Sequence, residues 1–181
     1  WRRPPPADSC STDAAGSRTA LRAGGLKRAV AAAVRGDTPR LQLADLAYAP
    51  LLPEPGKIIC LGLNYFDHAR EAGRDKPEYP WLFYRGASSL LAHGQPGIVP
   101  KVSSKFDYEA ELAVVIGARV PRHVPAAEAL RYVFGYSCFN DMSVRDYQKR
   151  TPQWTIGKNF DDTGAFGPVL VSADQLPPGG I

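Results

Sequence analysis

The sequence Phe106-Asp107-Tyr108-Glu109-Ala110-Glu111-Leu112-Ala113-Val114-Val115-Ile116-Gly117 predicts a β-strand at the centre of this chain. Aliphatic and β-branched residues fill its second half, and Gly117 is typical of a strand end. Because side chains alternate along a strand, Glu109 and Glu111 are expected to project from the same face, about 7 Å apart. The sequence therefore predicts two neighbouring carboxylates.

Neighbouring carboxylates repel each other unless a cation or a shared proton lies between them. A solvated strand face is one explanation of the two glutamates, and a divalent metal site is the other. A second apolar run, residues 132–139, ends in Asn140-Asp141, so Asp141 could bring a third carboxylate to the same place. Three carboxylates with open coordination positions suit Mg²⁺ or Mn²⁺ better than Zn²⁺, which prefers His and Cys.

Composition and charge exclude several classes of protein. The chain has 181 residues, of which 44% are hydrophobic and 22% charged, as in an ordinary globular domain. Residues 1–40 hold 8 of the 22 Lys and Arg but only 3 of the 18 Asp and Glu, so the net charge of +4 belongs to the leading segment. We therefore expect no nucleic-acid partner, and no apolar run is long enough for a membrane span. Three widely spaced cysteines argue against a disulfide framework and fit the cytoplasm.

Many short strands and few helices are expected, which favours a β-rich α+β fold. Patterns of apolar residues, proline and glycine predict strands at residues 57–62, 81–84, 96–100, 106–117, 132–139 and 166–171, and helices at residues 18–35, 65–72, 125–132 and 142–150.

Four separated blocks carry a resemblance to a known family. They are Gly62-Leu63-Asn64-Tyr65 with His68 and Glu71, Asp107-Tyr108-Glu109-Ala110-Glu111, Asn140-Asp141 with Arg145-Asp146, and Gly157-Lys158-Asn159-Phe160. On these blocks the chain resembles the fumarylacetoacetate hydrolase family, most closely its smaller bacterial acylpyruvate and fumarylpyruvate hydrolase-like members.

The resemblance covers residues 57–171 approximately and implies a mixed β-sandwich roll of the fumarylacetoacetate hydrolase C-terminal-domain type. We expect a disordered leader at residues 1–17, an N-terminal lead-in segment at residues 18–55 and a catalytic domain at residues 56–181. Because the family's domain continues further, we expect this one to be a partial copy, incomplete at its C-terminus.

The resemblance assigns Glu109, Glu111 and Asp141 as metal ligands, with Mg²⁺ or Mn²⁺ as the cofactor and Ca²⁺ as a substitute. It assigns His68, Glu71 and Lys158 as catalytic. His68 and Glu71 lie three apart on a predicted helix, where the carboxylate would orient the imidazole and raise its pKa, as a general base requires. An exposed surface pair is the alternative for these two. Lys158 would stabilise an oxyanion.

Two further residues, Arg145 and Gln148, are expected to share a helical face and match substrate-contacting positions of the family. One departure concerns Arg85-Gly86, where family members often have Lys-Pro. Because arginine keeps the charge but not the geometry of lysine, we expect Arg85 to affect substrate preference.

The resemblance implies a metal-dependent hydrolase that cleaves a C–C bond in a β-diketo acid, an acylpyruvate or fumarylpyruvate, in aromatic-compound catabolism. An isomerase, a tautomerase or an oxaloacetate decarboxylase with the same metal site is one alternative. A truncated metal-binding remnant without activity is another. The expected partners are a small keto-acid substrate and a second copy of the chain in a homodimer.

Overall fold

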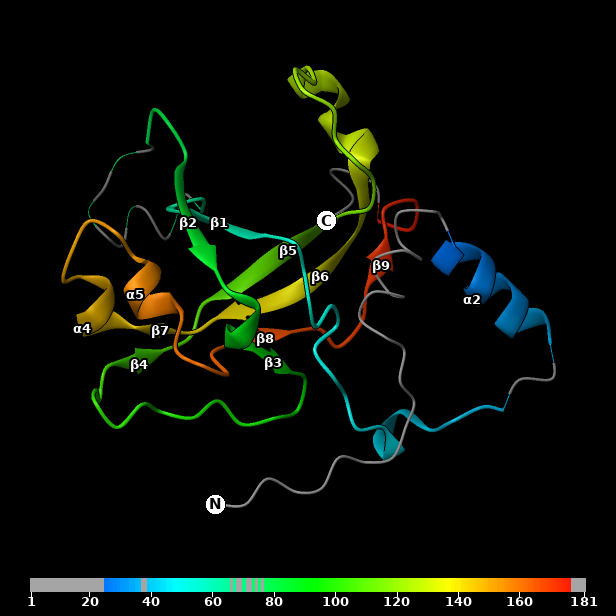
Figure 1. Cartoon of the computed structure of the whole chain (residues 1–181), viewed down its shortest axis with the longest axis horizontal. Helices are drawn as coiled ribbons and strands as arrows, with labels where there is room; N and C mark the ends of the chain where they lie inside the picture. Colours follow the sequence, from blue (N-terminus) through cyan, green and yellow to red (C-terminus); the bar gives the residue numbers. More distant parts are fainter. Residues whose placement is uncertain are drawn as a thin grey trace.

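The computed structural model describes residues 25–36, 39–65, 67, 70, 73, 75 and 77–176. The expected disordered leader, residues 1–17, lies outside the described residues, as does most of the helix expected at residues 65–72. Helix α2 (Gly25–Arg35) coincides with the second part of the helix expected at residues 18–35. It lies apart from the strands in Figure 1, and its side chains from Arg28 onward are exposed.

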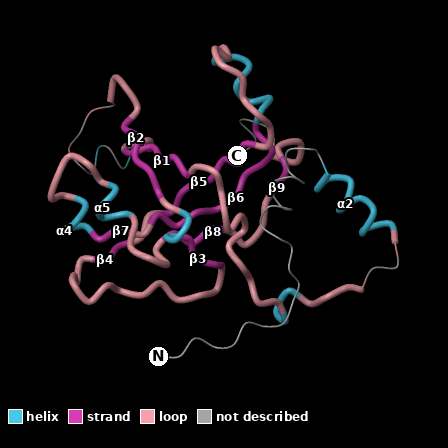
Figure 2. Tube along the Cα trace, viewed as in Figure 1, coloured by secondary structure: helices cyan, strands magenta, loops and turns pink. Residues whose placement is uncertain are grey.

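Short strands dominate the rest of the described chain. They are β1 (Ile58–Gly62), β2 (Trp81–Arg85), β3 (Leu90–Ala92), β4 (Phe106–Asp107), β5 (Ala110–Ile116), β6 (Val133–Asp141), β7 (Ser143–Val144), β8 (Gly164–Phe166) and β9 (Val171–Ser172). The other helical segments are η1 (Leu43–Asp45), η2 (Ala87–Ser89), η3 (Ala126–Tyr132), α4 (Arg145–Gln148) and α5 (Thr155–Lys158). Figure 2 shows the strands gathered centrally with loops around them, so the expected β-rich mixed fold is confirmed.

The main sheet has the strand order β3-β8-β6-β5, and β9 also pairs with β6. β3 and β8 run parallel, whereas the other pairs in this sheet are antiparallel. β1 with β2 and β4 with β7 form two further antiparallel pairs. Leu90, Val115, Phe139 and Phe166 come one each from β3, β5, β6 and β8 and form a buried core cluster, so the core joins the four strands of this sheet, whose long β5–β6 pair is visible in Figure 1.

The single strand expected at residues 106–117 is interrupted at Tyr108 and Glu109. β4 pairs with β7, whereas β5 pairs with β6. Side chains satisfy the two amides at the break, because Tyr108 N–H donates to Asp107 Oδ1 at 2.9 Å and Glu109 N–H donates to Asn140 Oδ1 at 3.1 Å. The chain can therefore change strand partners without leaving either amide unpaired.

Three other expectations need correction. Residues 96–100 form no strand, since Pro96 and Pro100 cannot donate to a ladder, and the strand lies earlier, at β3. Pro168 likewise interrupts the strand expected at residues 166–171, which is divided into β8 and β9. The helix expected at residues 142–150 shortens to α4 because the residues just before it pair with β4.

Candidate metal centre

Three carboxylates meet where β4 gives way to β5 and where β6 ends. Glu109 lies at the break, Glu111 is two residues further along β5, and Asp141 is the last residue of β6. The amide of Asp141 donates to the carbonyl oxygen of Glu109 at 2.9 Å, which places these two residues opposite each other. One carboxylate oxygen from each of the three residues lies within 4.8 Å of the others. The juxtaposition expected from strand alternation is therefore present.

This donor set fits a hard divalent cation. An octahedral Mg²⁺ site has ligands at roughly 2.1 Å, so ligand oxygens are separated by about 3 to 4 Å, close to the spread seen here. Glu111 adds a second argument, because none of the described residues donates a hydrogen bond or forms an ion pair with its carboxylate. Within the described part of the chain, Glu111 is therefore the carboxylate of the three that forms no ion pair, and such a group is suited to bind a metal.

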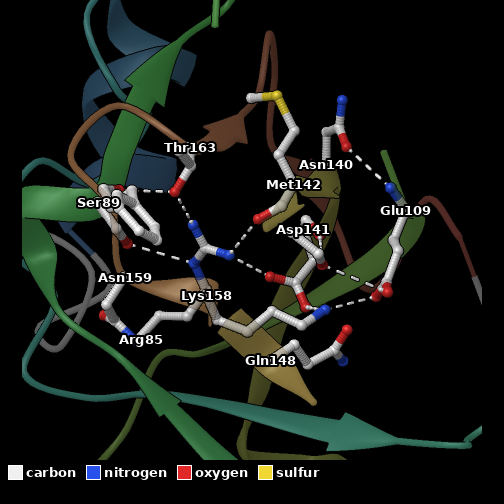
Figure 3. A network of polar contacts seen from close by, with 12 residues as sticks. Arg85, Ser89, Glu109, Asn140, Asp141, Met142, Gln148, Lys158, Asn159 and Thr163 are labelled. Atoms are coloured by element: carbon white, nitrogen blue, oxygen red, sulfur yellow. Dashed lines mark hydrogen bonds and ion pairs between the residues drawn. The ribbon is translucent and has the colours of Figure 1, made fainter. Parts of the chain in front are cut away.

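Lys158 is the cation at the centre of the cluster. Its side chain is only 1% exposed, and its Nζ donates to Glu109 Oε2 at 2.8 Å and to Asp141 Oδ2 at 2.7 Å. Helix α5 supplies this residue, and Figure 3 shows its side chain reaching across to both carboxylates. The structure thus brings the expected lysine directly onto two of the three expected ligands.

Arg145, the first residue of α4, contacts the cluster from its more exposed side. Its guanidinium donates to Asp107 Oδ2 at 2.9 Å, to Gln148 Oε1 at 3.1 Å and to Glu109 Oε1. Its side chain is 24% exposed, so part of it remains accessible to a ligand. The expected pair Arg145 and Gln148 therefore lies at the edge of the carboxylate cluster, while His68 and Glu71 lie outside the described residues.

The acidic groups differ in their proton affinity. Burial raises the pKa of Glu111 to about 7, and the negative charges of Asp141 and Glu109 add to the effect. Burial also acts to raise the pKa of Glu109, but the positive charges of Lys158 and Arg145 outweigh it and hold this pKa below its ordinary value. At neutral pH Glu109 is therefore ionised, and Glu111 is close to its midpoint.

The raised pKa of Glu111 predicts that an increase in pH lowers the stability of the metal-free protein and raises its affinity for a divalent metal. Without metal, the folded state holds this proton more tightly than the unfolded chain does. The stabilisation is thus fully present below about pH 4.5 and is lost as the pH rises through about 7. We expect the free energy of unfolding of the metal-free chain to fall from pH 5 to pH 8, approximately, relative to Glu111→Gln. Affinity for Mn²⁺ should rise over the same interval, because the metal binds the deprotonated carboxylate.

Urea denaturation without metal and Mn²⁺ titration, each at both ends of this interval, measure the two quantities. A difference in unfolding free energy between wild type and Glu111→Gln that is the same at both pH values would contradict the assignment.

Arg85 has a different place in the site from the one expected. The sequence tied it to substrate preference, but its side chain is fully buried and forms an ion pair with Asp141 Oδ1. The spacing in the sequence could have indicated this position, because side chains two apart on a strand share a face and Arg85 follows the apolar Phe83 by two residues. Both side chains are buried in the structure. Asn140, which fixes the backbone of Glu109, was also not expected to be a site residue.

Residues 57–180 match the family described as Fumarylacetoacetate (FAA) hydrolase C-terminal. With the carboxylate cluster and the mixed sheets in place, the class is clear: the chain belongs to the fumarylacetoacetate hydrolase family. The expected resemblance and fold type are thereby confirmed. Among the described residues, no helix has the length and apolar character needed to cross a membrane.

Proteins named for different activities resemble the chain. The human mitochondrial oxaloacetate tautomerase FAHD2A is 36% identical over 146 residues, which cover 80% of this chain and 46% of that protein. The crystal structure of maleylpyruvate hydrolase from Sphingobium sp. SYK-6 has a TM-score of 0.71 at 30% identity, covering 90% of this chain and 56% of that one. That of 5-carboxymethyl-2-hydroxymuconate delta-isomerase from Mycobacterium smegmatis has a TM-score of 0.64 at 37% identity, covering 78% and 55%. The chain spans about half the length of the curated relatives it matches.

Proposed function

We propose that this chain carries the metal site of an enzyme that hydrolyses a C–C bond in a β-diketo acid of the acylpyruvate or fumarylpyruvate type. The observation that carries the proposal is the cluster of Glu109, Glu111 and Asp141 around the buried ammonium of Lys158. Family membership supports a hydrolase or isomerase of this general kind, and the maleylpyruvate hydrolase among the similar structures supports the hydrolytic interpretation.

Glu109, Glu111 and Asp141 would hold Mg²⁺ or Mn²⁺. When bound, the divalent metal would polarise the keto oxygen of the substrate and stabilise negative charge on the departing pyruvate. All three donors are carboxylate oxygens, which hard cations prefer, and the site contains no described His or Cys ligand that would favour Zn²⁺.

Lys158 and Arg145 supply the positive charge that the reaction needs from the protein itself. Lys158 lies in a water-poor position, where an ammonium stabilises a developing oxyanion more strongly than it would in bulk water. Arg145 is partly exposed at the mouth of the cluster, and its planar fork suits a substrate carboxylate, with Gln148 beside it. His68 with Glu71 as the base that activates water stays a prediction outside the described residues.

A second function with the same site is proton transfer without bond cleavage. The tautomerase and the isomerase among the relatives favour it, because both reactions stabilise an enolate next to a carboxylate. Oxaloacetate decarboxylation is a further alternative at the same site: it breaks the C–C bond to the distal carboxylate, releases CO₂ and leaves a pyruvate enolate that is then protonated. Hydrolase and isomerase differ in where a proton or a water molecule goes, whereas the metal ligands are the same.

Pyruvate release decides between these proposals. The chain is incubated with fumarylpyruvate or acetylpyruvate, with and without Mn²⁺ or Mg²⁺, and pyruvate is measured by a coupled dehydrogenase assay. Metal-dependent release that Glu111→Gln abolishes supports the hydrolase. Keto–enol exchange of oxaloacetate without pyruvate release supports the isomerase. Metal binding with neither activity would contradict both and leave a metal-binding remnant.

The homodimer and the cytoplasmic location expected from the sequence stay predictions. Sedimentation velocity of the purified chain measures its mass in solution, and a monomer over a wide range of concentrations would contradict the dimer.

A further inference from the structure

Arg85 is the largest fully buried side chain of the described residues that carries a charge. It ends β2, on the same face of the strand as the buried Phe83, and its guanidinium lies 5.6 Å from the ring centroid of Phe139. A charge in such a place is costly unless every donor finds a partner. The contacts of Arg85 therefore need an explanation beyond packing.

Four acceptors surround the guanidinium. Nε donates to Ser89 Oγ at 3.2 Å, and Nη2 donates to Thr163 Oγ1 at 2.8 Å. Nη1 donates to the carbonyl oxygen of Met142 at 3.3 Å and to Asp141 Oδ1. Three of these acceptors are neutral and come from separate segments of the chain, so they fix the orientation of the planar group. The fourth is one of the three clustered carboxylates.

Asp141 is consequently held between two buried cations. Arg85 binds Oδ1 and Lys158 binds Oδ2, as Figure 3 shows, and the side chain of Asp141 is 0% exposed. Each oxygen keeps a second lone-pair direction for another ligand. With both oxygens bound by fixed partners, the carboxylate has one orientation relative to Glu109 and Glu111.

The backbone nearby makes room for this arrangement. A Cβ at Gly164 would lie 3.0 Å from Arg85 Nη2 and 2.9 Å from Phe139 Cζ, so a side chain there would displace the guanidinium. Gly86 N–H donates to Asn159 Oδ1 at 2.6 Å, which a proline at position 86 could not do. Arg85 and Gly86 are therefore both suited to their surroundings: Gly164 leaves room for the guanidinium, and the Gly86 amide makes a hydrogen bond that the proline of a Lys-Pro pair could not make.

We propose that Arg85 is a positioning residue for metal binding: it fixes the carboxylate of Asp141 in the orientation needed to share a divalent cation with Glu109 and Glu111. It does so through Asp141, and its burial keeps it from touching a substrate. The inference rests on the proposed metal site and is independent of the proposed reaction.

Two effects of Arg85 on metal affinity have opposite signs, and the choice of variant separates them. Its positive charge repels a divalent cation, so removal of the charge alone would strengthen binding. Its geometry orients a ligand, and loss of such an outer partner typically weakens binding 10- to 100-fold, approximately. Arg85→Lys keeps the charge but loses the fork, because one ammonium cannot reach Ser89, Thr163 and Asp141 together.

The experiment measures Mn²⁺ affinity by electron paramagnetic resonance of the free ion, with the whole chain and no substrate. We expect Arg85→Lys to weaken binding by about 10-fold or more. Arg131→Lys is the matched control, because Arg131 pairs with Glu128 at the surface of η3, and it should bind as wild type does. Thr163→Val, which removes one neutral acceptor and keeps the shape, should weaken binding in the same direction by less.

Arg85→Lys and Thr163→Val that both fold and bind Mn²⁺ within about twofold of wild type would overturn the positioning role. If Arg85→Lys does not fold, Mn²⁺ binding by Thr163→Val alone decides the question in the same way. A wild-type chain that binds no Mn²⁺ overturns the role together with the metal site. The Mn²⁺ titration is done without substrate and does not depend on pyruvate release. A wrong assignment of the reaction would therefore change the result of the turnover assay and leave the Mn²⁺ affinities unaffected.

Discussion

Asp141→Asn is expected to destabilise the folded chain by about 3 to 5 kcal/mol and to abolish Mn²⁺ binding. Asp141 is fully buried between Arg85 and Lys158, and neutralising it leaves two buried cations short of their shared anion. Removal of one partner from a buried ion pair costs more than the net energy of the pair, because the remaining charge is left desolvated.

Urea denaturation of the metal-free chain measures this loss. Asp107→Asn is the matched control, since it makes the same chemical change at an ion pair with Arg145 in which the aspartate is 48% exposed. That variant should lose no more than about 1 kcal/mol, as is usual for solvent-exposed pairs. Equal losses in the two variants would show that burial at the cluster does not set the strength of these pairs.

Lys158→Met is expected to separate metal binding from catalysis. Removing this buried ammonium takes a positive charge away from Glu109 and Asp141, so Mn²⁺ affinity should be maintained or increased. Pyruvate release should fall by about 100- to 1,000-fold, the usual cost of losing one donor to a developing oxyanion. The metal-free variant should also unfold more easily, because two carboxylates lose a shared partner.

Three measurements on one sample test this prediction. Mn²⁺ titration, pyruvate release at saturating metal, and the rise in melting temperature caused by Mn²⁺ should show unchanged or tighter binding, lost turnover and a larger rise than in wild type. Lys149→Met, a change at an exposed lysine of the loop after α4, is the control and should alter none of them. Lost Mn²⁺ binding in Lys158→Met would instead make the lysine a positioning residue for the ligands.

Local patterns explain why the carboxylates could be predicted. Alternation on a strand is a property of consecutive residues, so Glu109 and Glu111 fall on one side whatever the strand pairs with. The end of the apolar run at Asp141 is also visible in the sequence, and family blocks added Lys158, Arg145 and Gln148. These assignments needed only short-range regularity together with the order of the blocks.

The break at Glu109 could not be predicted in the same way. Its amide is satisfied by Asn140, 31 residues away, and the residues on either side of the break pair with two different strands. The alternation of apolar and polar residues along a strand does not specify which other strand it pairs with. The position of Arg85 is a similar case, because its acceptors Thr163 and Asp141 lie 78 and 56 residues away.

Residue patterns predicted a β-rich chain, and the resemblance to the family predicted that Glu109, Glu111 and Asp141 would converge. The pairing of each cation with a particular carboxylate oxygen could be seen only in the folded chain. Arg85 and Lys158 take the two sides of Asp141, while none of the described residues forms an ion pair with Glu111. The physical reason is that burial and ion pairing depend on contacts between distant segments, and these contacts set both the orientation and the proton affinity of each carboxylate.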